Sequence, residues 1–352
     1  MKDVTYLFGA GASFNAIPVV NDFYRSFDTY TTILNKQMKS GPGFEDRVKV
    51  SGTIYNYSYT EVAETLYKIC SETYNKAKYH QTFDTYAKML YLTRNNAVLK
   101  TLKIVLSSYF YYIQSFKEID KRYDHFLASI IQGIDVENPK FDIFPENIRI
   151  LSWNYDLQFE LALRKYLYKI SDYHSLINKS NLHIDPISIS RNHKFNILKL
   201  NGSSLVSESE NTTGLFPTTD TYNDDTMAIR RAIQAATVLL YGKNKVEPKL
   251  YFSWEGKFDT DKYPDSGLSY QLAKTEVLVV IGYSFPFFNR MVDRLIIGQM
   301  NKLDTIYLQS PEPGVSEAAE RLNSVISNMP NGSKIKVKLV KEVDQFYLPG
   351  EL

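Results

Sequence analysis

The sequence predicts an α/β protein with a doubly wound parallel sheet, a Rossmann-like fold, and three observations lead to this prediction. Short apolar runs without strict alternation recur along the chain, which is typical of strands buried on both faces. Between them lie stretches whose apolar residues are three and four positions apart, as in helices. With 352 residues, 44% of them hydrophobic, the chain is long enough for one large domain or two modest ones.

The predicted strands come first, because their order defines the sheet. Five runs have the buried pattern: Val4–Phe8, Ile148–Ser152, Asn196–Leu200, Glu276–Ile281 and Thr305–Leu308. Residues 334–340 (KIKVKLV) alternate instead, as an edge strand with one solvated face would. Helical spacing in residues 154–170 and in Asn289–Met300 alternates with these strands, which favours parallel crossover connections.

The predicted organisation has three parts: a Rossmann-like domain in residues 1–58 and 135–352, a helical insertion in residues 59–134, and a second, partly irregular insert in residues 203–265. The helical insertion carries two apolar stripes, from Val62 to Cys70 and from Leu99 to Ile113. The second insert begins rich in Ser, Thr, Asn and Asp, and residues 226–242 within it have helical spacing.

Composition and charge argue against several classes of protein. Lys and Arg number 41 against 39 Asp and Glu, so no bulk field favours direct nucleic-acid binding. The most apolar long stretch is interrupted by Lys100 and Lys103, and Val4–Phe8 is too short for a signal-peptide core, so we expect a cytoplasmic protein without a membrane span. The single cysteine, Cys70, cannot supply a disulfide framework or a cysteine-ligated zinc site, and no metal is expected.

Four short polar motifs directly follow or overlap the ends of predicted strands, at the edge where an open parallel sheet binds its ligand. In chain order they are GAGAS (residues 9–13), WNYD (153–156), KLNGS (199–203) and GYSF (282–285). The carboxyl ends of parallel strands share one edge of the sheet. We therefore expect these motifs to lie close together.

The first motif is a glycine turn between a strand and a helix-like stretch. Gly9 and Gly11 put no side chain in the way, so backbone N–H groups at a helix N-terminus can approach a phosphate. Phe14 stands where the dinucleotide fingerprint has its third glycine, and no Gly-Lys-Ser/Thr follows as in a P-loop. An ordinary tight turn explains the two glycines about equally well.

The second motif places two polar side chains two positions apart. Asn154 and Asp156 are expected to enter the crevice at the sheet edge while Tyr155 packs away from it. An asparagine offers a donor and an acceptor, which suits ribose hydroxyls or a carboxamide. Alternatively, Asp156 caps the following helix and Asn154 shapes the turn.

The last two motifs also have two interpretations each. Asn201 and Gly202 form a common turn dipeptide. Gly282 and Ser284 either approach a ribose or phosphate or turn the chain before Pro286.

In type and order, these motifs resemble those of the Sir2 (sirtuin) superfamily, most closely its bacterial Sir2-like branch of NAD-consuming anti-phage effectors. By motif order the resemblance spans residues 1–311, and FDTYAKML with Asp84 also resembles this branch. It implies these NAD-binding positions: Gly9, Ala10, Gly11 and Ser13 in the phosphate turn, Pro18 in the loop that covers NAD, Trp153–Asp156 at the nicotinamide ribose, Gly282, Ser284 and Phe285 in the late element, and Gln309 at the adenosine ribose.

Two departures from the family pattern bear on activity. Protein-deacylating sirtuins carry a four-cysteine zinc ribbon, so with Cys70 alone deacetylation is not expected. The family's general base is the His of Lys-Leu-His-Gly-Ser, and Asn201 occupies that position and cannot take up a proton at neutral pH. Loss of a base typically costs about 10²–10⁴-fold. Because nicotinamide departs as a neutral molecule, positioning and electrostatic stabilisation can still carry much of the reaction.

The resemblance thus implies a regulated NAD⁺ hydrolase that releases nicotinamide and ADP-ribose as an anti-phage effector. Asn154 would orient the nicotinamide ribose and the attacking water, with Asp156 or Asp84 stabilising positive charge. His80, His193 or a partner would supply a base. By family analogy the partner is a second copy of the chain or a separate sensor, such as an Argonaute-like protein or a HerA-like ATPase.

Two further functions stay open at the level of the sequence. Asn201, the third candidate catalytic position, favours a catalytically silent sensor or scaffold that binds NAD or ADP-ribose. ADP-ribosyl transfer to a macromolecule is the weaker alternative.

Overall fold

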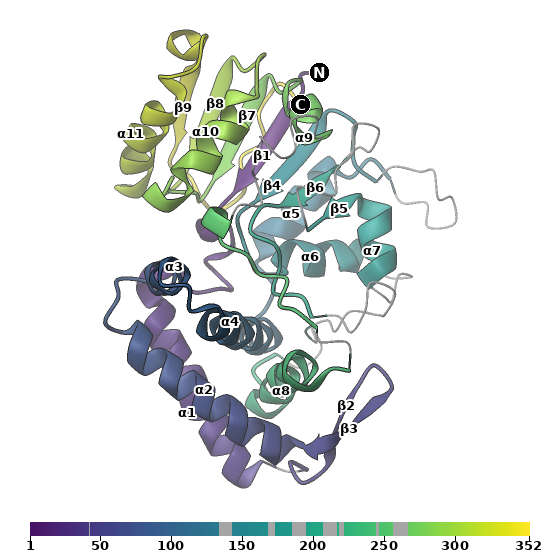
Figure 1. Cartoon of the computed structure of the whole chain (residues 1–352). Helices are drawn as coiled ribbons and strands as arrows, with labels where there is room; N and C mark the ends of the chain where they lie inside the picture. The colour runs from purple at the N-terminus through teal and green to yellow at the C-terminus, as the bar shows by residue number, and fades with distance from the viewer. Residues whose placement is uncertain are drawn as a thin grey trace.

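The computed structural model describes residues 1–41, 43–133, 143–167, 173–184, 195–206, 217, 222–243, 246–255 and 267–352. Within these, one seven-stranded parallel sheet has the order β5-β6-β4-β1-β7-β8-β9. Its strands are β1 (Val4–Phe8), β4 (Ile148–Ser152), β5 (Leu182–His183), β6 (Ile197–Lys199), β7 (Val277–Ile281), β8 (Thr305–Gln309) and β9 (Lys336–Val340). Helices flank this sheet in a Rossmann-like, doubly wound arrangement, which confirms the predicted fold class (Figure 1).

The first strand of the chain, β1, is the central strand of the sheet. After β1 the chain adds β4 and then β5 and β6 on one side, and it crosses back to add β7, β8 and β9 on the other. The order therefore reverses at β1, and ligands of open α/β sheets bind at the carboxyl end of such a switch point. Strand β9 forms an edge of the sheet, as its alternating sequence predicts.

The two faces of the sheet carry different helices because alternate residues of each strand point to opposite sides. In β1, Tyr6 and Phe8 pack on one face and Leu7 on the other. The first face is covered by α5 (Lys121–Ile130), α6 (Gln158–Tyr166), α7 (Tyr173–Ser180) and the segment around Phe346. The second is covered by α9 (Gly267–Leu272), α10 (Arg290–Gly298) and α11 (Gly314–Ile326).

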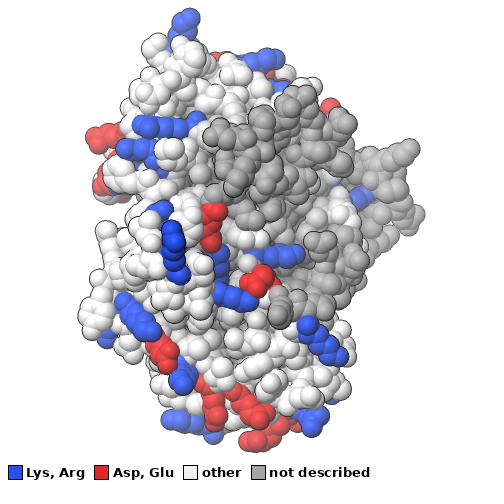
Figure 2. Space-filling view, viewed as in Figure 1, with Lys and Arg blue, Asp and Glu red and all other residues white. Residues whose placement is uncertain are grey.

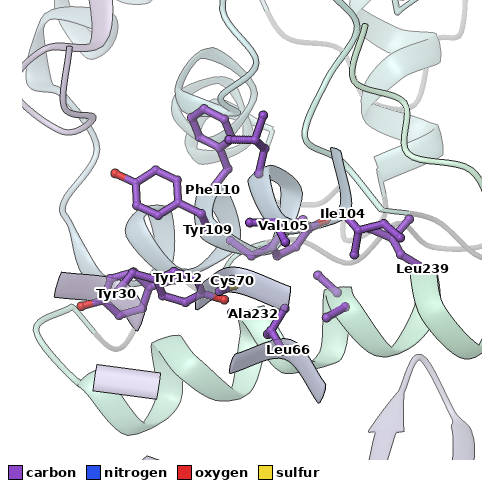
Figure 3. Packing of buried hydrophobic residues seen from close by; sticks show 14 of the residues in the cluster. Tyr30, Leu66, Cys70, Ile104, Val105, Tyr109, Phe110, Tyr112, Ala232 and Leu239 are labelled. Atoms are coloured by element: carbon purple, nitrogen blue, oxygen red, sulfur yellow. The ribbon is translucent and has the colours of Figure 1, made fainter. Parts of the chain in front are cut away.

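A separate helical layer lies beyond the carboxyl edge of the sheet (Figure 1). It contains α1 (Val20–Ser40), α2 (Tyr59–Ala77), α3 (Phe83–Leu92), α4 (Asn96–Phe116) and α8 (Asp225–Tyr241). Figure 3 shows its core, in which Leu66 and Cys70 of α2, Val105 and Tyr109 of α4 and Ala232 of α8 are buried together. The predicted apolar stripes therefore face this core.

A small hairpin extends the helical layer. Strands β2 (Arg47–Val50) and β3 (Thr53–Ser58) pair antiparallel around Ser51 and Gly52, which both have positive φ angles, 46° and 87°. This is the conformation that two-residue hairpin turns require. Helix α2 follows directly, with a capping box between Ser58 and Glu61.

The residues that pack in the helical layer do not coincide with the predicted insertion of residues 59–134. Helix α1 and the hairpin pack with the helical layer, although they fall within residues 1–58. Helix α5 instead packs on the sheet, where its Phe126 ring lies 5.5 Å from Phe8. Helix α8, from the second insert, joins the helical layer, and much of the rest of that insert is outside the described residues.

Surface charge and hydropathy add two observations. In the face viewed in Figure 2, basic and acidic side chains are interspersed over the part that the structure describes. Among the described helices, none has the length and apolar character needed to cross a membrane.

Candidate functional site

Backbone hydrogen bonds bring the carboxyl ends of the central strands together. The Gly9 N–H donates to the Ile281 carbonyl over 2.9 Å, and the Trp153 N–H donates to the Phe8 carbonyl over 2.9 Å. On the far side of β4, the Leu200 N–H donates to the Ser152 carbonyl over 2.7 Å. All four sequence motifs thus sit on one edge of the sheet.

The glycine turn packs tightly against the turn that follows β7. A Cβ atom on Gly9 would lie 2.6 Å from Tyr283 Cα, and one on Gly11 would lie 2.9 Å from Gly282 Cα. Gly282 itself has a φ of +61°, which favours glycine. Close backbone approach therefore accounts for all three glycines.

Three N–H groups of this turn donate to backbone carbonyls. Gly9 donates to Ile281, Gly11 donates to the Gly282 carbonyl over 2.9 Å, and Ala12 donates to the Gly9 carbonyl over 2.9 Å. The turn leads into a short 3₁₀ helix, η1 (Ala10–Ser13), and α1 begins only at Val20. The helix-terminus argument for phosphate binding therefore does not apply to Gly9 and Gly11 in this conformation, and the tight-turn interpretation suffices for them.

Ser13 is the centre of a buried polar cluster. Its Oγ lies 2.9 Å from the hydroxyl of Tyr123 and accepts a hydrogen bond of 3.3 Å from Nδ2 of Asn154. The Ser13 side chain also favours the ionised form of Asp156. Asn154 and Asp156 are only 6% and 5% exposed. The structure thus brings together Ser13, Asn154 and Asp156, and it adds Tyr123 from α5.

Asp156 precedes Leu157, the N-cap residue of α6, and its side chain binds the backbone at the start of that helix. Its Oδ1 accepts a 3.0 Å hydrogen bond from the N–H of Gln158, the first residue of α6. Burial raises the pKa of the Asp156 carboxyl above its usual value, and the opposing influences of Lys199 and the Gln158 N–H do not fully offset this. Asp156 therefore both starts the helix and contributes a perturbed carboxyl to the cluster.

A buried ion pair lies beside this cluster. The Nζ atom of Lys199 donates to the Asp156 carbonyl over 2.5 Å and lies 3.2 Å from Oε1 of Glu160. Burial also raises the pKa of Glu160, against the effect of Lys199. This pair was not predicted, and its only signals in the sequence are a lysine at the end of a buried strand and a glutamate in an apolar helix.

Asn201 lies at the end of β6, beside the Asn154 segment. Its Nδ2 is 3.4 Å from both the Trp153 carbonyl and the Tyr155 hydroxyl. The side chain is 7% exposed, and its Oδ1 has no hydrogen-bond partner in the structure as described. A buried acceptor without a partner is uncommon. The next residue, Gly202, has a φ of +69°, so the turn interpretation also holds for this dipeptide.

Tyr155 packs against the helical layer, and its hydroxyl also lies 3.4 Å from Nδ2 of the site residue Asn201. Its ring lies 6.0 Å from Phe110 of α4 and 6.1 Å from Phe252. Burial raises its pKa well above the usual value, and the charge of Asp84 in α3 raises it further. Burial likewise raises the pKa of Asp84, to about 6. The charge of Asp84, in the opposite layer, thus influences the pKa of Tyr155.

A charged pair that was not predicted from the sequence, Arg122 and Asp120, supports the glycine turn. Nη2 of Arg122 donates to the Ala12 carbonyl over 2.9 Å and to the Gly11 carbonyl over 3.3 Å, and the guanidinium also binds Asp120. Burial opposes ionisation of Asp120, but Arg122 outweighs it and holds the Asp120 pKa below its usual value. No sequence motif identifies Arg122 and Asp120, because their role depends on where α5 packs.

The remaining predicted positions lie further from the cluster. Ala10 is exposed, and Pro18 is half-buried before α1. Ser284 is exposed and its carbonyl accepts from Arg321 over 3.1 Å, whereas Phe285 is buried with a φ of +51°.

The side chain of Gln309, predicted to contact the adenosine ribose, is hydrogen-bonded to the C-terminal segment. Its Nε2 donates to the carbonyls of Glu342 and Gln345, and its Oε1 accepts a 3.0 Å hydrogen bond from the Tyr347 N–H. Of the two histidines considered as bases, His80 packs its ring 5.2 Å from Tyr86, and His193 lies outside the described residues.

Neither a protein-family model nor a curated protein sequence matches the chain. Over the described ranges, no three His, Cys, Asp or Glu side chains gather as a metal site would require. The geometry of the polar cluster is therefore the basis for the functional argument.

Proposed function

We propose that the polar cluster at the carboxyl edge binds NAD⁺ and hydrolyses its nicotinamide–ribose bond. The observation that carries this proposal is the convergence of Ser13, Asn154 and Asp156 with the unpartnered Oδ1 of Asn201. They meet at the switch point of a parallel sheet, where such folds bind ligands. The amide, hydroxyl and carboxyl groups suit the hydroxyls of a ribose and the carboxamide of nicotinamide.

Each residue has a defined role in this proposal. Ser13 holds the Asn154 amide through Nδ2, which directs the Asn154 side chain and leaves its Oδ1 for a ribose hydroxyl or the attacking water. Water adds to the anomeric carbon as the bond to nicotinamide breaks, nicotinamide leaves as a neutral molecule, and the water proton passes to solvent. The Asp156 carboxylate stabilises the positive charge that develops on the ribose.

Control of the activity is part of the proposal, because unregulated hydrolysis would exhaust cellular NAD⁺. The resemblance to Sir2-like anti-phage effectors supports a cytoplasmic effector that a partner or self-assembly activates. A homo-oligomer or a separate Argonaute-like or HerA-like sensor would fill this role.

Release of nicotinamide from NAD⁺ tests the activity, with and without the product of the neighbouring gene. We expect release by the wild-type chain and a loss of at least about 100-fold in Asn154→Ala, because the substrate and water lose their orienting amide. Asn328→Ala removes an exposed asparagine side chain on a remote helix end and should retain full activity. Full activity of Asn154→Ala, or no nicotinamide under any activating condition, contradicts the proposal.

Asn201 favours a second candidate function, a sensor that binds NAD⁺ or ADP-ribose without cleaving it. An asparagine at this position can accept a hydrogen bond through its unpartnered Oδ1 but cannot remove a proton at neutral pH. Calorimetry separates the two candidates. Saturable binding of NAD⁺ without nicotinamide release supports the sensor, and binding with release supports the hydrolase.

A further inference from the structure

Asp293 is a buried carboxyl group behind the candidate site. It lies on α10, only 2% exposed, and the hydroxyl of Tyr283 is 3.0 Å from each of its oxygens. The neighbouring Trp153 indole also favours its ionised form. Asn289 completes the group by donating through Nδ2 to the Tyr283 hydroxyl over 3.0 Å. One carboxyl thus ties together the segments that follow β4 and β7.

Both segments contribute to the site. Trp153 immediately precedes Asn154, and Tyr283 immediately follows Gly282, against which the turn after β1 packs. The Trp153 and Tyr283 rings are stacked, with centroids 5.9 Å apart and planes 16° from parallel. Asp293 is thus connected to Asn154 through the hydroxyl of Tyr283, the stacked Tyr283 and Trp153 rings and one peptide unit.

The charge state of Asp293 is set by two opposed influences. Burial favours the neutral acid and raises its pKa to about 8, while the hydrogen bond from Tyr283 and the nearby Trp153 indole favour the carboxylate. Both of these groups can donate, and the indole N–H can only donate. The ionised form presents only acceptors to these two donors, whereas the protonated acid also presents a donor of its own.

Charged groups on the packed elements are engaged elsewhere. On α10, Arg290 lies over the Phe287 ring and Arg294 donates to the Ser324 carbonyl. On α11, Arg321 binds Glu317 and the Ser284 carbonyl. Beside α9, Lys274 lies over the exposed Tyr270.

We propose that Asp293 is a positioning residue for the candidate site, whose carboxylate holds Trp153 and Tyr283 so that Asn154 is correctly oriented only when Asp293 is ionised. The effect on substrate rests on the proposed function. The effect on Trp153 does not, because it is a property of the folded chain alone. NAD⁺ affinity and turnover should then increase as the pH rises through the ionisation of Asp293.

Tryptophan fluorescence tests the first step without NAD⁺. The chain has two tryptophans, so Trp254→Phe leaves Trp153 as the only indole. We expect its emission to change with a midpoint near pH 8, and this titration should vanish in Asp293→Asn. Tyr283→Phe removes a donor to the carboxylate and should raise the midpoint by about one pH unit. A titration that persists unchanged in folded Asp293→Asn overturns the proposal.

The pH profile of nicotinamide release tests the second step. The wild-type rate should increase between pH 7 and 9, while Asp293→Asn should show little dependence over this range, as the asparagine does not ionise. A titrating Trp153 with an equally pH-dependent rate in wild type and Asp293→Asn overturns the positioning role. If Trp153 titrates as expected but no protein releases nicotinamide or binds NAD⁺, the function proposed above fails while the link from Asp293 to Trp153 stands.

Discussion

Lys199 and Glu160 place opposite charges in the interior, directly beside Asp156. Removing both charges from water is costly, and the close approach of 3.2 Å between Nζ and Oε1 offsets that cost only while both partners are present. The pair also keeps the Lys199 ammonium on the Asp156 carbonyl, and its positive charge favours the ionised Asp156 side chain. The Lys199–Glu160 pair therefore supports the candidate site from inside the protein.

Glu160→Gln should therefore lower the free energy of unfolding by about 3–5 kcal/mol, because it leaves the Lys199 charge buried without its partner. Urea denaturation measures the change. The double variant Lys199→Met, Glu160→Leu removes both charges and should recover most of the loss. A cost below about 1 kcal/mol for Glu160→Gln would contradict a buried, paired charge at this position.

The candidate site residues were only partly predictable, for a physical reason. Asn154, Asp156 and Ser13 stand in short motifs at strand ends, so their positions along the sequence identify them. Tyr123 and Arg122 lie in α5, which reaches the site by packing on the sheet. Tyr123 is over 100 residues from Ser13 in the sequence. Single-sequence periodicity does not specify such a contact.

The turns after β1 and β7 pack together as one structural unit. Gly9 and Gly11 pack against the backbone of Gly282 and Tyr283, and two N–H groups of the first turn donate to carbonyls at the end of β7 and in the turn after it. The requirement for glycine is therefore steric. It holds whether or not a phosphate binds nearby.

Gly9→Ala tests this packing. The new methyl group would meet the Tyr283 Cα at 2.6 Å, and we expect a loss of about 1–3 kcal/mol in the free energy of unfolding. Gly298→Ala is the matched control, since its methyl group would have no neighbour within 4 Å and should leave stability unchanged or slightly increased. Unchanged stability in Gly9→Ala would show that the turn tolerates a side chain.

The strands were predictable because each buried strand reads as a short apolar run bounded by polar residues. The predicted bounds of Val4–Phe8 and Ile148–Ser152 agree with β1 and β4, and the other predicted strands differ by one or two residues at one or both ends. The two-residue strand β5 and the β2–β3 hairpin were not predicted. A strand of two residues has no periodicity, and the hairpin's pattern depends on packing against the helical layer.

The whole molecule consists of a sheet domain and a helical layer that meet at the candidate site. Gln114 of α4 accepts a hydrogen bond from the N–H of Leu157, which packs in the sheet domain. Tyr155, between the two site residues Asn154 and Asp156, packs on the helical layer. A partner that moved this layer would therefore act directly on the segment that carries Asn154, which is where the proposed control would operate.

Calorimetric titration with NAD⁺ tests the central claim most directly. The wild-type chain and Asn328→Ala should bind about one NAD⁺ per chain, and Asn154→Ala should bind at least about tenfold more weakly, because one orienting amide is lost. Equal affinity of Asn154→Ala and the wild type, or no saturable heat with the wild-type chain, would contradict the assignment of NAD⁺ to the carboxyl edge of the sheet.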